Sequence, residues 1–332
     1  MSAAPIRWGI VGTGNIAHRF TEDLLRLPDH AVVAVGSRSP TTAASFARRH
    51  GLPRHHGSYA DLAADDEVDV VYIATPHNVH HSAARTCLEA GRAVLVEKPF
   101  TTTAAEADDL IALARARGRF AMEAMWTRFN PVIARLRRLV GDGAIGRVQA
   151  VYADFSIDVP YDPRHRVWAA ELAGGALLDL GVYPVSFAWM LLGPPDQARA
   201  VSTPAPTGVD ANTAIVFGYS SGAVAMLHCG LRAESPQTAT VVGTTGRIHV
   251  AAPFWRPDGL TLMRDGAPPE TFGVTLDGHG YTYQAAEVAA CLRAGRMESA
   301  LVPLDETRDI LGVLDDLRRS PEHARAPGPA DR

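Results

Sequence analysis

Residues Ile6–Ala17 read I-R-W-G-I-V-G-T-G-N-I-A, an apolar run followed by the spacing Gly-x-Gly-x-x-Ala. The run predicts a buried strand over Ile6–Val11, and the pattern after it predicts a helix to about Leu27. In a strand–turn–helix context, this spacing is the dinucleotide-binding fingerprint. We therefore assign cofactor contacts to Gly12, Thr13, Gly14, Asn15 and Ile16.

Each small residue of the fingerprint has a physical task. Gly12 permits a tight turn, and Gly14 lets the backbone approach a pyrophosphate. Ala17 allows close packing of helix on strand, while the helix N-terminus supplies N–H groups and the positive end of a dipole. The alternative is an ordinary glycine turn, and the surrounding strand and helix argue against it.

The second predicted strand, Ala31–Gly36, is followed by Ser37 and Arg38. A site for NAD usually carries Asp or Glu at this point, to bind the ribose hydroxyls. An arginine can instead grip a 2′-phosphate with two hydrogen bonds. Ser37 and Arg38 therefore favour NADP, with NAD as the less favoured cofactor. The alternative is that Arg38 lies on a solvated turn.

A third apolar strand, Val68–Ala74, ends in the stretch T-P-H-N-V-H-H. Three histidines in five residues suggest a metal site, but no Cys or carboxylate follows at a metal-ligand spacing. We therefore predict no metal. The stretch is better explained as a strand end that lines the nicotinamide side of a cofactor cleft. We therefore assign Thr75, Pro76 and His80 to the cofactor.

The stretch Ala93–Phe100, A-V-L-V-E-K-P-F, predicts a short buried strand that ends in two opposite charges and a proline. Ligands of open α/β sheets bind at the carboxyl ends of the strands. Lys98 is therefore placed for chemistry, and Glu97 and Lys98 are expected to contact the cofactor. The alternative is a salt-bridged strand end at the surface.

The pattern of elements changes near Pro131. Before it, strands alternate with helices, which predicts a doubly wound parallel sheet. After helix Val132–Val140, strands follow one another across Gly- and Pro-bearing turns, which predicts an antiparallel sheet. The remaining predicted helices are Thr41–His50, His81–Ala90, Glu106–Arg117, Tyr281–Arg293 and Asp305–Arg319. The strands expected after Pro131 are Val148–Ile157, Ala198–Thr203, Thr213–Tyr219, Ala223–Leu231, Thr238–Val242 and Arg247–Val250.

The fold class is therefore α/β: an N-terminal Rossmann domain with a doubly wound parallel sheet, plus a C-terminal α+β domain with a mainly antiparallel sheet. We expect a cofactor-binding domain at 1–123, a second domain at 124–320, and a mobile tail at 321–332.

Composition narrows the functional classes. The formal net charge is −4 with both signs mixed along the chain, so we expect neither nucleic acid nor a membrane as partner. No signal peptide and no apolar run of about 18 residues is recognised. The three cysteines are widely spaced, as in reduced cytosolic proteins. We expect a cytoplasmic protein that acts on a small molecule.

Five motifs together resemble the Gfo/Idh/MocA oxidoreductase family. They are G-x-G-x-x-A at 12–17, T-P-x-x-x-H at 75–80, E-K-P at 97–99, W-T-R-F-N-P at 126–131 and G-G-A-L-L-D-L-G-V-Y at 174–183. Tyr183, where many relatives carry histidine, is similar to the branch of dimeric dihydrodiol dehydrogenases and NADP-dependent D-xylose 1-dehydrogenases. The resemblance implies an open sheet whose outer face forms the contact of a homodimer or a higher homo-oligomer, which makes 124–320 the substrate-binding and dimerisation domain. It also implies that the Lys98–Pro99 bond is cis.

The apolar segment Ala176–Leu192 predicts a buried helix with Asp179 and Tyr183 on one face. An unpaired carboxylate there is costly, so Asp179 needs a partner. One alternative is that the two side chains only bond each other or the backbone. The functional interpretation makes Tyr183 the acid/base, Lys98 the ammonium that favours tyrosinate and holds the substrate oxygen, and Asp179 the group that orients Lys98.

Aromatic and basic residues near the domain junction complete the predicted site. Trp126, Arg128 and Phe129 are candidates for the cleft wall, the first two also for cofactor contacts, and Arg166 with Trp168 is a second substrate candidate. The predicted reaction is hydride transfer from a secondary alcohol of a sugar, cyclic polyol or trans-dihydrodiol to NADP. The alternatives are a reductase of a keto-sugar or dicarbonyl, and a non-catalytic dinucleotide-sensing regulator.

Overall fold

The computed structural model describes residues 4–319, which divide into two compact units. The first contains the described residues up to Trp126 together with Leu276–Arg308, and the second contains Thr127–Thr275 with the described residues from Asp309 on. We had expected residues 124–320 to form one domain. The structure instead assigns 276–308 to the first unit, and the predicted tail at 321–332 lies outside the described residues.

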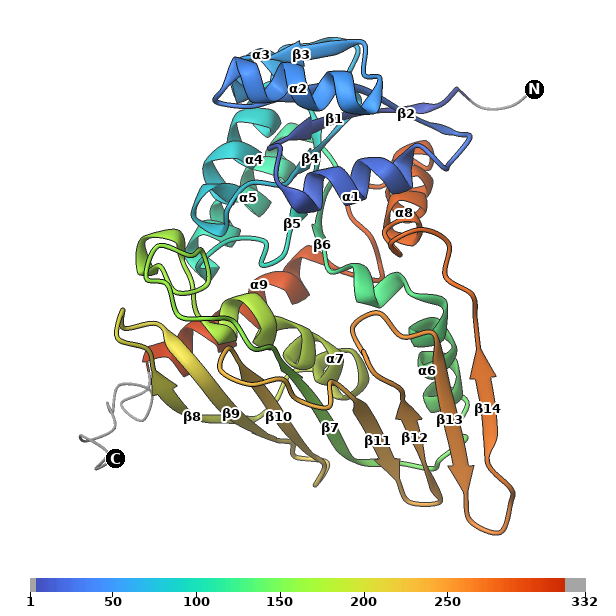
Figure 1. Ribbon diagram of the computed structural model, residues 1–332. Coiled ribbons are helices and arrows are strands. Elements are labelled where there is room, and N and C mark those ends of the chain that lie inside the picture. The colour runs from blue at the N-terminus through green and yellow to red at the C-terminus, as the bar shows by residue number, and fades with distance from the viewer. Residues whose placement is uncertain (1–3, 320–332) are drawn as a thin grey trace. The chain divides into compact units, whose positions relative to one another are not determined.

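The first unit is built on a parallel six-stranded sheet in the order β3-β2-β1-β4-β5-β6. Figure 1 shows this sheet in blue and cyan with its helices. The strands are β1 Ile6–Val11, β2 His30–Gly36, β3 Arg54–His56, β4 Val70–Ile73, β5 Ala93–Glu97 and β6 Ala121–Ala124. The helices are α1 Asn15–Leu24, α2 Pro40–His50, α3 Tyr59–Ala63, α4 His80–Glu89, α5 Ala104–Arg117 and α8 Thr282–Arg293.

The strand order fixes where a ligand binds. Strands β4 and β5 are buried at every position, as expected when helices cover both faces of a parallel sheet. The chain order reverses between β1 and β4, which makes their carboxyl ends the switch point at which doubly wound sheets bind ligands. The predicted Rossmann fold is confirmed.

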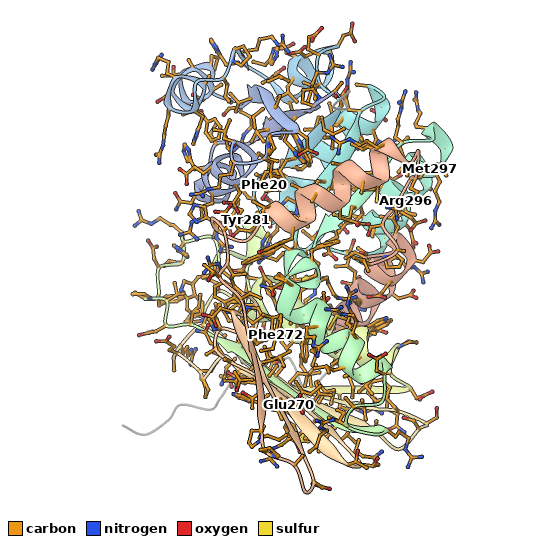
Figure 2. The ribbon with its side chains drawn as sticks, turned by 90° about the vertical axis from the view of Figure 1, so that its right-hand side faces the viewer. Phe20, Glu270, Phe272, Tyr281, Arg296 and Met297 are labelled. Carbon is orange, nitrogen blue, oxygen red and sulfur yellow. The ribbon has the colours of Figure 1, made fainter. Side chains whose placement is uncertain are left out.

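Helix α8 belongs to the first unit because its entry is anchored on α1. The carboxylate of Asp23 accepts hydrogen bonds from the backbone N–H groups of His279 and Tyr281, both at 2.8 Å. The rings of Phe20 and Tyr281 lie 6.3 Å apart, side by side in Figure 2. Contacts across more than 250 residues are invisible to local sequence patterns, so this division was not predicted.

The second unit is built on an eight-stranded sheet in the order β14-β13-β12-β11-β7-β10-β9-β8. Only β7 and β10 pair in parallel, so the predicted mainly antiparallel sheet is confirmed. Its strands are β7 Val148–Ser156, β8 Gln197–Pro204, β9 Asp210–Gly218, β10 Val224–Gly230, β11 Ala239–Gly243, β12 Gly246–Val250, β13 Gly259–Arg264 and β14 Glu270–Gly273. The helices are α6 Pro131–Gly141, α7 Val182–Leu192 and, running across the division at 308/309, α9 Leu304–Arg319.

The segment before α7 differs from the prediction. Leu177–Gly181 form a π-helical turn, and the α-helix begins only at Val182. Asp179 lies inside this wider turn, so the α-helical spacing that we used to place it on one face with Tyr183 does not apply. Ala170–Leu192 is long and apolar enough to cross a membrane, yet 83% of its most apolar window is buried in the structure, as in a core segment.

Candidate functional site

The loop between β1 and α1 has the shape that the fingerprint predicts. Gly12 has φ +103°, and a Cβ atom there would lie 2.6 Å from the carbonyl oxygen of Ala74. A Cβ on Gly14 would meet nothing within 4 Å, so this side of the loop is open. None of the described side chains caps the first N–H groups of α1, which leaves them available to an anion.

A second feature at the same sheet edge fits a dinucleotide. Thr75 follows β4, the neighbour of β1, and its buried hydroxyl has no hydrogen-bond partner among the described residues. A buried hydroxyl without a partner is costly unless a ligand or water completes it. The open loop at Gly14 and this hydroxyl together fit a dinucleotide held across the switch point.

His80 joins two loops of this edge. Its ring is fully buried, with Nδ1 2.8 Å from the carbonyl oxygen of Pro99 and Nε2 2.9 Å from that of Thr75. Burial, with a smaller effect of the Lys98 charge, lowers the pKa of His80 to about 4. The ring therefore holds the β4 and β5 loops together, and a direct contact with the cofactor stays a prediction.

Acid should destabilise the protein through His80. Because its folded pKa of about 4 lies below the ordinary 6.5, the unfolded chain takes up this proton first. Stability is therefore full above pH 6.5 and falls by about 3 kcal/mol as the pH drops to 4. Urea unfolding of the wild type and of His80→Asn between pH 7.5 and 4.5 measures the free energy of unfolding as a function of pH. This free energy should depend less on pH in the variant than in the wild type.

Exposed His55 provides the control, because its substitution by asparagine should leave the wild-type slope unchanged. Other histidines add in the same direction: burial lowers the pKa of His18 and of His50, whose rings meet at 2.7 Å. The His80 contribution is thus the difference between wild type and variant, and equal slopes would refute it.

The loop after β5 is fixed by carboxylates on the sheet. Glu97 is buried and accepts hydrogen bonds from the Tyr72 hydroxyl and, at 3.2 Å, from the N–H of Lys98. The N–H of Phe100 donates to Glu123 at 3.0 Å. The Lys98–Pro99 bond is cis, which confirms what the resemblance implied. The hydrogen bonds to Glu97 and Glu123 therefore fix the backbone that carries the half-buried side chain of Lys98.

One property of Lys98 escaped the motif analysis. It is the only lysine of the chain, since the other 31 of the 32 basic residues are arginines. Arginine presents a planar guanidinium, whereas lysine presents a compact primary amine on a flexible stem. A lone lysine among arginines indicates that this position needs a primary amine, and a count of residue types would have shown it.

The ribose end of the predicted cofactor site is held by hydroxyl groups. Ser37 Oγ lies 2.9 Å from Thr42 Oγ1, which also lies 3.5 Å from Thr13 Oγ1 of the fingerprint loop. Arg38, which follows Ser37, is exposed. The predicted cofactor residues of the first unit lie at one edge of one sheet: 12–16, Ser37, Arg38, Thr75, Pro76, His80, Glu97 and Lys98.

The second unit carries Asp179 and Tyr183, both buried. Asp179 Oδ2 forms a 3.1 Å ion pair with Nη2 of Arg166, whose side chain is 53% exposed. The expected need for a partner is confirmed, and Arg166, predicted as a substrate contact, is that partner. Contact of Asp179 with Lys98 stays a prediction.

The start of this segment is fixed by Asp210. Its Oδ2 accepts hydrogen bonds from the N–H of Leu177 and the hydroxyl of Thr213, both at 2.8 Å. Further along, a Cβ on Gly181 would lie 2.9 Å from the Cys229 sulfur on β10. The π-turn therefore lies close against the sheet, and π-turns of this kind are frequent at functional sites.

Tyr183 lies in aromatic surroundings that the sequence analysis missed. Phe155 on β7 meets its ring edge-on at 5.3 Å, and Trp255 stacks on Phe155 at 5.1 Å. Trp255 belongs to the loop before β13, which was not predicted as part of the site. The position of β7 in the sheet and the course of this loop bring the rings together, and neither can be seen in a local sequence pattern.

The W-T-R-F-N-P motif supports these groups. Thr127 Oγ1 donates to the carbonyl oxygen of Trp255 at 2.6 Å, and Asn130 Nδ2 to that of Pro257 at 3.0 Å. Buried Arg128 donates to the hydroxyl and the carbonyl oxygen of Ser186 on α7, both at 2.9 Å. The motif thus joins the Trp255 loop to the helix of Tyr183, and a cofactor contact of Arg128 stays a prediction.

The remaining predicted aromatics are packed side chains. In the first unit, Trp126 contacts Tyr281 with ring centroids 4.5 Å apart. In the second, Phe129 is buried and the indole N–H of buried Trp168 donates to the carbonyl oxygen of Pro160 at 3.1 Å. Their substrate contacts stay predictions. Within residues 4–319, no group of three or more His, Cys, Asp or Glu side chains could hold a metal ion.

Comparison with known proteins agrees with this geometry. Residues 6–125 match the model of an oxidoreductase family with an NAD-binding Rossmann fold, and residues 133–249 match the Gfo/Idh/MocA C-terminal domain. The chain is 38% identical over 326 residues to trans-1,2-dihydrobenzene-1,2-diol dehydrogenase of Bos taurus, covering 95% of this chain and 96% of that enzyme. The enzyme of the same name from Homo sapiens is 38% identical over 324 residues, with the same coverage.

Solved structures show the same fold. The 3-ketoreductase KijD10 from Actinomadura kijaniata, crystallised with NADP and TDP-benzene, superposes with a TM-score of 0.84 at 28% identity, covering 95% of this chain and 97% of that one. Aldose-aldose oxidoreductase from Caulobacter crescentus shares the fold, with a TM-score of 0.87 at 24% identity over 97% and 98% of the two chains. This chain belongs to the Gfo/Idh/MocA family and is an oxidoreductase that depends on NAD or NADP.

Proposed function

We propose that this oxidoreductase oxidises a secondary alcohol of a trans-dihydrodiol, sugar or cyclic polyol, with NADP as the hydride acceptor. The observation that carries the proposal is Tyr183, a buried phenol beside the aromatic pair Phe155 and Trp255. Aromatic faces bind the apolar faces of ring diols and sugars. The 38% identity to trans-dihydrodiol dehydrogenases supports the same substrate class.

The chain's own groups supply the proton chemistry. The nicotinamide, when bound, takes the hydride from the carbinol carbon. We assign to Tyr183 the removal of the hydroxyl proton, and to Lys98 an ammonium that holds the substrate oxygen and favours tyrosinate. Asp179 keeps the basic groups oriented, with Arg166 as its counter-ion. The dinucleotide would be held by residues 12–16, Ser37, Arg38 and Thr75.

The second candidate is reduction of a keto-sugar or dicarbonyl, favoured by the likeness to a 3-ketoreductase. The two directions are separated by measuring kcat/KM in each. Oxidation is measured with trans-1,2-dihydrobenzene-1,2-diol and D-xylose in the presence of NADP⁺, and reduction with a dicarbonyl in the presence of NADPH. The proposal expects the larger kcat/KM for an alcohol. A dicarbonyl preferred by an order of magnitude would favour the second candidate.

NADP is expected to bind in preference to NAD because of Arg38. Arg38→Ala should raise the Kd for NADPH by roughly ten- to a hundredfold and leave that for NADH within about twofold, since it removes a charged partner of the 2′-phosphate alone. Titration of dinucleotide fluorescence measures both constants. Tighter binding of NADH by the wild type would make the chain NAD-dependent.

We also propose that a second copy of the chain covers the outer face of the eight-stranded sheet. Met226 on β10 pairs with Val216 and Tyr152 on the neighbouring strands, and all three side chains are exposed. Val201, 68% exposed, and Val224 extend this apolar patch, and exposed Arg199 on β8 pairs with Val216 beside it. Apolar patches of this kind mark protein contacts, and a self-contact is the commonest.

Sedimentation velocity tests the dimer. Met226→Asp should convert it to monomer, because the substitution introduces a charge at the centre of the patch. Met297→Asp is the matched control, since this methionine is similarly exposed, 47% against 38%, but lies in the first unit. A monomeric wild type, or equal behaviour of the two variants, would contradict the proposal.

A further inference from the structure

The loop between β10 and β11 holds the carboxyl end of β7, the strand that carries Phe155. Ser156 follows Phe155, and its N–H donates to the hydroxyl of Ser235 at 2.9 Å. The carbonyl oxygen of Ser156 accepts from the N–H of Ser235 at 3.2 Å and from the side-chain amide of Gln237 at 3.1 Å. One loop therefore binds both backbone polar groups of the residue next to Phe155.

Gln237 also holds the loop that carries Trp255. Its side-chain oxygen accepts from the indole N–H of Trp255 at 3.0 Å, and its backbone carbonyl oxygen accepts from the N–H of Phe254 at 2.8 Å. An indole N–H can only donate a hydrogen bond, and a peptide carbonyl can only accept one. The amide of Gln237 meets both needs in a single orientation, with its oxygen toward Trp255 and its nitrogen toward Ser156.

The backbone of Gln237 has an uncommon conformation. Its φ is +54°, in the left-handed region that favours glycine. The carboxylate of Asp154 accepts from the N–H of Gln237 at 2.7 Å and from that of Thr238 at 3.3 Å, which stabilises the turn. A side chain at a position that would suit glycine, with its amide bonded at both ends, indicates that the amide itself has a task.

The amide joins the two rings that lie beside Tyr183. Trp255 stacks on Phe155, whose ring meets that of Tyr183 edge-on. Stacking alone lets one ring slide or turn over the other, whereas a hydrogen bond at the indole N–H selects one placement. Trp255 is half-buried, so part of its surface is open. Rings that are fixed in advance lose less entropy when a ligand binds against them.

We propose that Gln237 is a positioning residue for the substrate: its amide fixes the indole of Trp255 on Phe155, and the two rings so held form the apolar wall of the substrate site. This inference rests on the proposed function, which places the substrate against these rings. It gives the loop between β10 and β11 a part in substrate binding, although this loop carries none of the five motifs.

The first test compares the wild type with Gln237→Met. Methionine keeps the length and the unbranched shape of glutamine and removes both hydrogen bonds. The variant should raise KM for trans-1,2-dihydrobenzene-1,2-diol by roughly threefold to tenfold, with kcat and the Kd for NADPH within about twofold of the wild type. Gln149→Met is the matched control, because the amide of Gln149 on β7 donates to the backbone carbonyl oxygen of Val148 at 3.2 Å; it should change none of these constants.

A double-mutant cycle with Trp255→Phe shows whether Gln237 acts through the indole. Trp255→Phe keeps an aromatic ring and removes the N–H, so Gln237→Met should have no further effect on KM in this background. The same loss in that background, or equal weakening of substrate and NADPH, would show a merely structural role. A wild type that prefers a dicarbonyl would overturn the proposed direction of the reaction. The cycle is then measured with the dicarbonyl and still decides the role of Gln237.

A spectroscopic readout tests the contact without any substrate. The chain has five tryptophans, so protein labelled with ¹⁵N gives five indole N–H resonances, and the one missing from Trp255→Phe is that of Trp255. Gln237→Met should shift this resonance, and Gln149→Met should leave it in place. A resonance that Gln237→Met does not move would overturn the proposal.

Discussion

Lys98→Ala is expected to lower kcat by about a thousandfold while the Kd for dinucleotide stays within a few fold. Positioned proton-transfer and electrostatic groups contribute about 10²–10⁴-fold to a rate, and we assign both tasks to this amine. The backbone of the loop is held by Glu97 and Glu123, so loss of the side chain should leave the fold intact. Steady-state rates and fluorescence titration measure the two effects separately.

Lys98→Arg is the matched variant, because it keeps the positive charge and removes the compact ammonium. It should stay at least about a hundredfold below the wild type. If the arginine variant were as active as the wild type, the amine would serve only as a charge. If the alanine variant kept a tenth of the activity, Lys98 would not be catalytic.

Much of the first unit was predictable because its signals are local. The fingerprint turn, the apolar strands and the residues at strand ends all lie within short stretches, and parallel strands bring their ends to one edge. Strand β3 was missed because its three residues, Arg54–His56, have no apolar pattern, and α3 because it has one turn. Both are held by packing against β2 and not by propensity.

Several features of the second unit could not be predicted from local sequence patterns. Asp179 needs a partner by any electrostatic argument, but nothing local identifies Arg166 as that partner. The apolar run 176–192 predicts a helix, whereas the π-turn depends on Asp210 capping from another element. Phe155 and Trp255 join Tyr183 only through sheet register and a loop. The candidate residues could be named from the sequence, but the side chains that surround them could not.

Tyr183→Phe should lower kcat by about a hundredfold to ten-thousandfold with little change in dinucleotide affinity. The substitution removes one oxygen and keeps the ring packed against Phe155, so a folding defect is not expected. Tyr161→Phe serves as the control, since Tyr161 is an exposed phenol of the same unit and should keep full activity.

A spectroscopic readout tests whether Tyr183 and Lys98 act as a pair. Because Lys98 is the only lysine, reductive ¹³C-methylation gives one side-chain resonance beside that of the N-terminal amine. If the phenol and the amine interact in the enzyme, Tyr183→Phe shifts this resonance and Tyr161→Phe does not. A resonance unmoved by Tyr183→Phe, in a variant that has lost turnover, would leave Tyr183 as the acid/base but remove Lys98 as the group that favours its ionised form.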